Sequence, residues 1–187
     1  MSAPVQAPAP APAPAQPASG PISDNDVNEW KARLNEVLAD PGGVVKSKSP
    51  ATARPWHESF FGCFSPIDLC LVTYCCPCVT FGKTHHRLRK DPNLAGYEPI
   101  NTSCLGIWAA GCLCLYWVPL AMQRADVRAK YNLQGDCITD IAAACCCGLC
   151  SLVQQEKEAE YQGLQGEANK QPYQAPGGMT YPAAPQQ

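Results

Sequence analysis

Apolar residues recur at helical spacing near the N-terminal end of the chain, within residues 23–40. Those on the repeating positions are Val27, Trp30, Leu34, Val37 and Leu38. This spacing places them on one face of an amphipathic helix over residues 24–39. Ser23 is a typical N-cap residue, and Pro41-Gly42-Gly43 ends the pattern. The predicted helix either packs on its own domain or docks on a partner or a membrane surface.

Three uncharged runs follow, after a linker over residues 41–58. They cover residues 69–82, 99–123 and 141–155. Only the middle run reaches the length of about 20 residues that a transmembrane helix needs. Lys and Arg flank it on both sides, so a single span leaves one basic group on the wrong side, whereas a hairpin insertion returns both groups to one face. A buried hairpin in a soluble core is the alternative, and the pattern leaves both open.

The periodicity predicts a small, mainly α-helical, cysteine-rich domain over residues 59–160. Its hydrophobic part is either a helical hairpin or a single membrane-inserting segment. If residues 138–161 form one helix, one face of it carries a carboxylate and thiols at spacings of three and four. The residues on that face are Asp140, Ala143, Cys147, Cys150 and Gln154.

Composition separates this domain from the two ends of the chain. Residues 1–22 are rich in Ala and Pro, and residues 161–187 are rich in Gly, Pro, Gln and Tyr. Neither end has enough apolar side chains to offset the entropy lost on ordering. We therefore expect a disordered arm at the N-terminus and a disordered tail at the C-terminus.

All 13 cysteines lie between Cys63 and Cys150. The N-terminus has no basic segment followed by an apolar one, so we expect no secretory signal and a reducing compartment. An odd number of cysteines in such a compartment argues against a disulfide scaffold. A functional soft-metal site and the burial of cysteines as small apolar residues remain, and we favour the first.

Two C-x-x-C pairs stand out among these thiols, one formed by Cys75 and Cys78 and the other by Cys147 and Cys150. Two such pairs can hold one tetrahedral ion, and thiolates favour zinc, copper(I) and cadmium. The pairs lie much farther apart in the sequence than in short zinc modules. A shared site would therefore have to be assembled by the tertiary fold.

Asp140 is the only charged residue between Asp136 and Glu156. A buried carboxylate is costly unless it meets a cation, a donor network or a metal ion. Arg124 and Arg128 are candidate partners, so an ion pair between helices and a metal-ligand role both stay open. His85 and His86 lie in a basic segment, 83–90, which we expect to be a solvated face.

Charge and motifs exclude two classes of function. The net charge of −2 at pH 7 provides no basic excess for a nucleic acid. The chain has no Ser/His/Asp order, Gly-rich phosphate loop or paired-carboxylate motif, and nothing selects one cysteine as a nucleophile. We expect neither a nucleic-acid-binding protein nor an enzyme, and we assign no catalytic residue.

Two blocks of residues resemble the Cys-rich placenta-specific-eight family, which includes onzin, the plant cadmium resistance proteins, the cell number regulators and the fungal cadmium resistance proteins. The first block is Cys70-Leu71, four residues, then Cys76-Pro77-Cys78, similar to the family's CLxxxxCPC signature. The second comprises Arg124, Arg128, Tyr131, Gly135, Asp140, Cys147, Cys150, Gln155 and Glu156. The resemblance covers about residues 59–160, and the Ala/Pro-rich arm and first helix suggest a fungal-type member.

The resemblance implies a small membrane-associated protein, often a homo-oligomer, linked to cadmium or zinc tolerance or to cell number and stress responses. We therefore expect tolerance to soft metals, cadmium first, through metal binding or assisted transport at the plasma membrane or an endomembrane. No cofactor is obligatory, although thiolates can bind zinc or cadmium. The candidate ligands are Cys70, Cys75, Cys76, Cys78, Cys147, Cys150 and Asp140.

A different class of protein fits the same residues. This alternative is a non-enzymatic regulatory protein in the cytoplasm or nucleus, acting in the stress response or in control of cell number. Its helix at residues 24–39 or its tails would recruit protein partners, and its cysteines would be structural.

Overall fold

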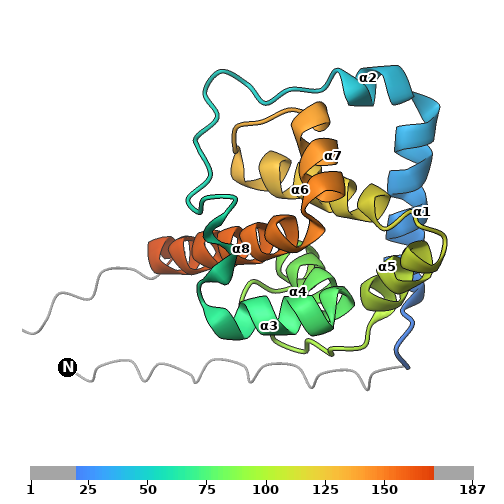
Figure 1. Cartoon of the computed structure of the whole chain (residues 1–187), viewed down its shortest axis with the longest axis vertical. Coiled ribbons are helices and arrows are strands. Elements are labelled where there is room, and N and C mark those ends of the chain that lie inside the picture. The colour runs from blue at the N-terminus through green and yellow to red at the C-terminus, as the bar shows by residue number, and fades with distance from the viewer. Residues whose placement is uncertain (1–19, 171–187) are drawn as a thin grey trace, which may run out of the picture.

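The computed structural model describes residues 20–170 of the 187-residue chain, with side chains as far as residue 166. Most of the predicted arm and residues 171–187 of the predicted tail lie outside the described residues. Within residues 20–170 the protein is helical, with two isolated β-bridges and no sheet (Figure 1). The expectation of a small, mainly α domain is confirmed.

Eight α-helices and one short 3-10 helix make up this described part of the chain. In order they are α1 (Asp24–Ala39), α2 (Pro41–Val45), η1 (Gly62–Phe64), α3 (Ile67–Cys75), α4 (Pro77–Arg89), α5 (Thr102–Cys112), α6 (Trp117–Tyr131), α7 (Cys137–Cys146) and α8 (Gly148–Lys170). Helix α8 continues beyond the domain boundary that we expected at residue 160.

The predicted amphipathic helix forms as α1 and packs on its own domain. Ser23 caps it, with its Oγ accepting the N–H of Asp26 at 3.5 Å. The Trp30 ring stacks on the rings of Phe81 and His85 of α4, at centroid distances of 5.7 and 5.1 Å. Trp30 therefore packs α1 on its own domain, as the first of the two expected roles requires, while Leu34 and Leu38 of the same face stay exposed.

The uncharged run at residues 99–123 does not form one segment. Asn101 caps α5, and the chain turns at Cys114, which has a φ of 57°, before α6 begins. Gly106 and Gly111 weaken helix formation within the run, and Leu113 leaves the helical region. Within residues 20–170, none of the helices has both the length and the apolar composition needed to cross a membrane. The expected membrane-inserting segment is therefore divided between two shorter helices.

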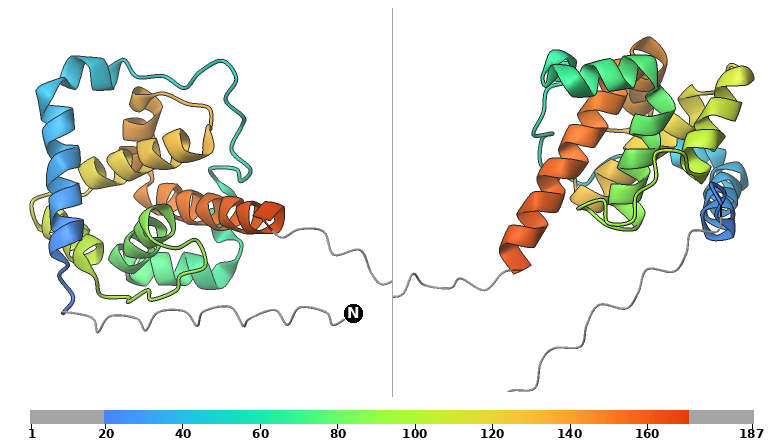
Figure 2. Two further views of the ribbon diagram at one scale, coloured as in Figure 1. Left: turned by 180° about the vertical axis from the view of Figure 1, so that it is seen from behind. Right: turned by 90° about the horizontal axis from the view of Figure 1, so that it is seen from below.

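Two pairs of helices are each joined through a single cysteine. Cys76 links α3 to α4 with φ −138° and ψ 68°, and Cys147 links α7 to α8 with φ −147° and ψ 78°. We call these the α3–α4 junction and the α7–α8 junction. Helices α3 and α7 lie at one side of the molecule, from which α4 and α8 run towards the opposite side (Figure 2, right). Residues 138–161, which would carry a carboxylate and thiols on one face as a single helix, form two helices, because the chain leaves the helical region at Cys147.

The main core lies where α4, α5, α6, α7 and α8 meet. Phe81 and Leu120 are each 1% exposed, and they pack with four further buried side chains. These four are Ile107, Ala121, Ala144 and Leu152. The core thus holds the two junctions at fixed positions relative to α5.

The linker at residues 41–58 is ordered and crosses the loop between α6 and α7. Lys48 forms a β-bridge with Asp136, and Arg54 forms one with Leu133. The Trp56 indole donates a hydrogen bond to a backbone carbonyl of the same loop, at 2.9 Å. The linker therefore belongs to the folded domain.

Candidate thiol site

A pocket of 740 Å³ opens between the two junctions and α5. Four thiols line it, those of Cys75, Cys76, Cys78 and Cys112. Its aromatic lining comes from Tyr74, Trp108 and Tyr116, and the second junction contributes Gly148 and Leu149. We call it the thiol pocket. Three of the six predicted cysteine ligands meet there, together with one cysteine that the motif did not include.

Proline 77 explains how the α3–α4 junction presents its thiols. A residue before proline is kept out of the helical region, so α3 ends with Cys76 as its C-cap. Pro77 then occupies the first turn of α4, where its missing N–H is tolerated. Cys75 and Cys76 are exposed and Cys78 is half-buried. Because the helix is interrupted at Cys76, these thiols line the pocket and do not lie along one continuous helix.

Cys104 of α5 lies behind the thiol pocket and is buried. Burial raises the pKa of its thiol to about 12, and the neighbouring Cys78 thiol raises it further. A metal ion binds the thiolate form, so Cys104 is a poor first ligand and serves as a neutral packing group. Sequence spacing did not single out this residue, because it reaches Cys78 only through the packing of α5 on α4.

The second C-x-x-C pair lies in a different cluster. Cys147 and Cys150 pack with Cys63 of η1, Phe60, Leu69 and Val153, and neither lines the thiol pocket. Cys70 is half-buried on α3 and also lies outside the lining of the pocket. The six predicted cysteine ligands are therefore distributed over at least two places.

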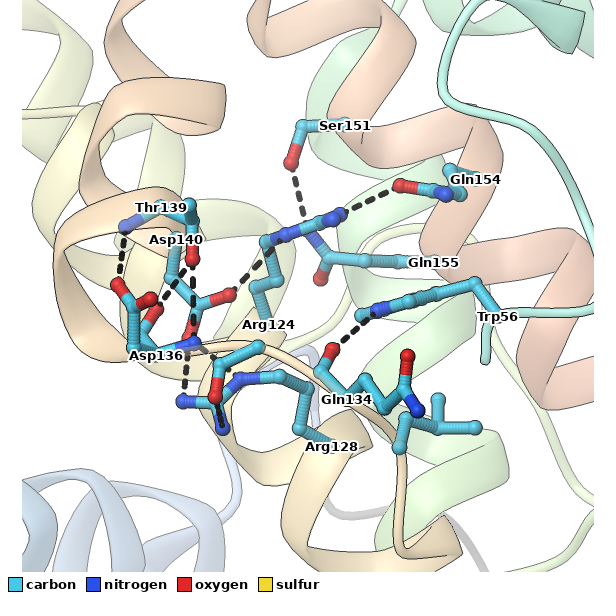
Figure 3. A network of polar contacts seen from close by, with 12 residues as sticks. Trp56, Arg124, Arg128, Gln134, Asp136, Thr139, Asp140, Ser151, Gln154 and Gln155 are labelled. Atoms are coloured by element: carbon cyan, nitrogen blue, oxygen red, sulfur yellow. Dashed lines mark hydrogen bonds and ion pairs between the residues drawn. The ribbon is translucent and has the colours of Figure 1, made fainter. Parts of the chain in front are cut away.

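Asp140 is held by two arginines. Its Oδ1 lies 3.2 Å from Nε of Arg124, and its Oδ2 lies 2.7 Å from Nη2 of Arg128 (Figure 3). The carboxylate is 2% exposed, and both of its oxygens meet cations, which stabilises the buried charge without a metal ion. The ion pair between helices is confirmed, and Asp140 is not part of the thiol pocket.

Other residues of the second sequence block extend this polar network. Arg124 donates to Oε1 of Gln154 at 2.8 Å, and its guanidinium lies 4.2 Å from the ring centroid of Trp56. Gly135 has a φ of 147°, and a Cβ there would lie 2.8 Å from the Cδ of Arg128. The network thus fixes α6, α7, α8 and the linker relative to one another.

The expectation of a solvated basic face at His85 and His86 is wrong, because both side chains are buried. Trp30 of α1 covers His85, and burial lowers the pKa of this imidazole to about 4. The ring of His86 lies at 3.0 Å from the backbone carbonyl of Ala95. A residue outside the cysteine-rich region therefore covers His85, and the loop after α4 covers His86, which the local sequence could not indicate.

A buried glutamate locks α4 to α8. Glu156 is fully buried, and its Oε1 lies 2.9 Å from Nε of Arg87 and 3.1 Å from Nζ of Lys83. The hydroxyl of Thr84 donates to its Oε2 at 2.8 Å. Lys83 and Arg87 of α4 thus compensate the buried charge of Glu156. These contacts fix the orientation of α4 on α8, and with it the position of the thiols at the start of α4.

The thiol pocket has soft donors but no preassembled ligand set. Among residues 20–170, no three His, Cys, Asp or Glu side chains lie close enough together to hold an ion in their present rotamers. Binding at the pocket would require rotation of the exposed side chains of Cys75, Cys76 and Cys112. Such rotation is a small change for exposed cysteines, and thiolates match zinc and cadmium.

The model of the PLAC8 family matches residues 56–158, more than half of the chain and both helix junctions. The chain belongs to the PLAC8 family. The family-level resemblance inferred from the two sequence blocks is confirmed, and α1 lies outside the matched region of this PLAC8 protein.

Three relatives of this PLAC8 protein are plant proteins. It is 33% identical over 114 residues to Protein PLANT CADMIUM RESISTANCE 2 of Arabidopsis thaliana, covering 61% of this chain and 72% of the relative. It is 35% identical over 147 residues to Protein PLANT CADMIUM RESISTANCE 1 of the same plant, covering 72% and 90%. It is 30% identical over 115 residues to Cell number regulator 10 of Zea mays, covering 62% and 71%. No solved structure matches the chain.

Proposed function

We propose that this PLAC8 protein raises tolerance to soft heavy metals, cadmium first and zinc second, by capturing the ion on thiols of the thiol pocket. The observation that carries the proposal is the convergence of Cys75, Cys76, Cys78 and Cys112 on one pocket. The names of the cadmium resistance relatives support a metal-tolerance role in the family. No catalytic step is part of the proposal.

The ligand chemistry follows from the exposure of these thiols. Cys75, Cys76 and Cys112 are exposed and reach a hydrated ion directly, while Cys78 supplies a half-buried sulfur beside them. Cadmium binds thiolates, so binding releases protons and weakens as the pH falls. The pocket would hold the ion either for storage or for transfer to a transport step in a homo-oligomer.

We place this activity at the surface of the plasma membrane or an endomembrane. The helices beside the thiol pocket carry exposed apolar side chains, a surface composition suited to the interfacial region of a bilayer. These side chains are Ile67, Leu71, Val72, Tyr74, Trp108, Leu113, Leu115 and Tyr116. In this arrangement α3 and α5 lie against the lipid headgroups with the thiol pocket between them.

Vesicle flotation tests this placement. The full chain should float with lipid vesicles, and the double substitution Leu71→Glu with Trp108→Glu should reduce the floated fraction about tenfold or more, since charged groups are disfavoured at the apolar interface. The control, Leu38→Glu with Leu164→Glu, changes exposed apolar residues of α1 and α8. Equal flotation of both double variants would contradict a membrane-facing role for α3 and α5.

Cadmium survival of metal-sensitive cells, together with total cell cadmium, tests the thiol pocket. Wild type should protect, and Cys76→Ser with Cys78→Ser should lose most of that protection at equal expression. The matched control is Cys145→Ser with Cys146→Ser, an exposed adjacent pair outside the pocket lining. Lower cell cadmium with wild type would indicate export, and unchanged cadmium would indicate chelation.

Retained protection by the Cys76 and Cys78 double variant would overturn the pocket as the site of metal capture. The second candidate would then lead, a regulatory interaction protein in the cytoplasm or nucleus, favoured by the cell number regulator among the relatives. Deleting residues 1–19 removes none of the described contacts and tests recruitment by the arm: protection lost with this deletion supports recruitment. The fungal-type assignment stays a prediction.

A further inference from the structure

Three cysteines form a cluster at the α7–α8 junction, outside the lining of the thiol pocket. The Sγ of Cys63 in η1 lies 3.1 Å from the Sγ of Cys150 in α8. Cys63 is 1% exposed and Cys150 is 6% exposed. Cys147 packs against the small core that these two cysteines form with Val153. We call these three residues the Cys63 cluster.

The sulfur separation indicates which chemistry the pair can undergo. Two sulfurs bound to one tetrahedral zinc ion at about 2.3 Å lie ~3.8 Å apart. The separation of 3.1 Å between Cys63 and Cys150 is shorter than that, and a bond of about 2.05 Å needs only a small approach. The pair is therefore arranged for a disulfide more closely than for a shared metal ion.

Cys147 connects this buried pair to solvent. It stands immediately before α8, its thiol is half-buried, and its Sγ accepts the backbone N–H of Cys150 at 3.3 Å. The thiolate is the reactive form of a cysteine, and an oxidant reacts with it only where the sulfur is accessible. Burial raises the pKa of Cys150, and the thiols of Cys147 and Cys63 add to this effect. Among the three cysteines of the cluster, Cys147 is thus the one that an oxidant reaches first.

We propose that the Cys63 cluster is a reversible oxidation site, in which Cys147 reacts with a hydroperoxide and the oxidation ends as a Cys63–Cys150 disulfide. The Cys147 thiolate attacks the peroxide oxygen and forms a sulfenic acid, while the O–O bond breaks and the leaving oxygen departs as water or an alcohol. Cys150 attacks the Cys147 sulfur, an S–S bond forms and water leaves. Cys63 then attacks the Cys150 sulfur and releases Cys147 as a thiol.

The balance of this sequence is simple. Two thiols are oxidised to one disulfide, and one hydroperoxide is reduced to water and an alcohol, or to two waters for hydrogen peroxide. The two thiol hydrogens leave in these products. The new bond joins positions 87 residues apart, and it ties η1, which leads into α3, to α8.

The test uses the reduced full chain with one equivalent of hydrogen peroxide, acid quenching, alkylation of remaining thiols and peptide mass spectrometry. A Cys63–Cys150 crosslink should be the main product, and a reducing agent should remove it. Cys147→Ser should slow its formation about tenfold or more without changing the product. The matched control, Cys146→Ser, changes the exposed neighbouring thiol and should leave the rate unchanged.

Several outcomes would overturn this proposal. In the peroxide experiment they are a main crosslink between other cysteines, no crosslink, or an unchanged rate in Cys147→Ser. A separate contrary result would be that one equivalent of cadmium protects all three thiols from alkylation. None requires a folded Cys63 or Cys150 variant. Because Cys76→Ser with Cys78→Ser should form the same crosslink, failure of the metal-capture proposal and failure of this one are distinguishable.

Discussion

Asp140 illustrates how contacts decide the role of a single carboxylate. In sequence it is an isolated acid in an apolar stretch, and a metal ligand and an ion-pair partner look alike there. In the fold, Arg124 and Arg128 approach its two oxygens from α6. The sequence indicated both arginines as candidate partners, but only the packing of α7 on α6 decides between the roles.

Asp140→Asn should lower the free energy of unfolding by about 3–5 kcal/mol, because it leaves two buried guanidinium groups without their counter-charge. Urea denaturation followed by circular dichroism measures this change. The control is Asp68→Asn on the exposed start of α3, which should change stability by less than about 0.5 kcal/mol. Equal stabilities of the two variants would contradict a structural role for the ion pair.

At the scale of elements, α1 covers part of α4, although α1 itself lies outside the region that matches the family. Trp30 packs on His85 and donates its indole N–H to Ser103 at 3.0 Å. Lys90 of the α4 C-terminus reaches Asp26 at 2.9 Å. The periodicity predicted this helix correctly, whereas its docking place depends on residues of α4 and α5 far away in the sequence, and Leu34 and Leu38 of its apolar face stay exposed.

Removing the cover should change the titration of His85. Its pKa in the folded protein is about 4, against 6.5 for the free side chain. Trp30→Ala admits water and should raise this pKa towards 6.5, measured by the pH dependence of the imidazole resonances in nuclear magnetic resonance. The His57 ring stacks on Tyr161 and is the internal control. An unchanged His85 titration would show that α1 is not what excludes water.

The same lowered pKa makes the stability pH-dependent in a definite direction. The unfolded chain takes up a proton at His85 near pH 6.5, and the folded chain does so only near pH 4. The unfolded state therefore gains stability as the pH falls between these values. The decrease in the free energy of unfolding that His85 causes approaches about 3 kcal/mol near pH 4. Trp30→Ala should reduce this decrease.

The two helix junctions differ in how visible they are in the sequence. Pro77 marks the first, because a proline limits the conformation of the residue before it. The second has only Gly148, which is a weaker signal in a run of Ala and Cys. A Cβ at Gly148 would lie 3.2 Å from the Tyr116 ring, so this glycine permits a close approach that only the folded structure displays.

At the scale of the whole molecule, helix content, the first helix and the CPC site were predictable, because they depend on local periodicity and a short motif. The division of the run at residues 99–123, the burial of His85 and the pairing of Cys63 with Cys150 were not. Each depends on contacts between distant segments, and Cys63 lies 87 residues from its partner. Cysteine spacing alone therefore grouped Cys147 and Cys150 with the CPC thiols, from which the fold separates them.

The two junctions also determine the charge balance around the thiol pocket. Helices α4 and α8 each start directly after a junction cysteine, and residues of both first turns line the pocket. Each helix start carries a partial positive charge of about half an elementary unit from its aligned peptide dipoles, and the ends of α3 and α7, which meet the same two cysteines, carry the opposite partial charge. Positive and negative helix ends are thus paired at each junction. In a pocket lined by no Lys or Arg, the charge of a captured ion would therefore have to be balanced by its own thiolate ligands.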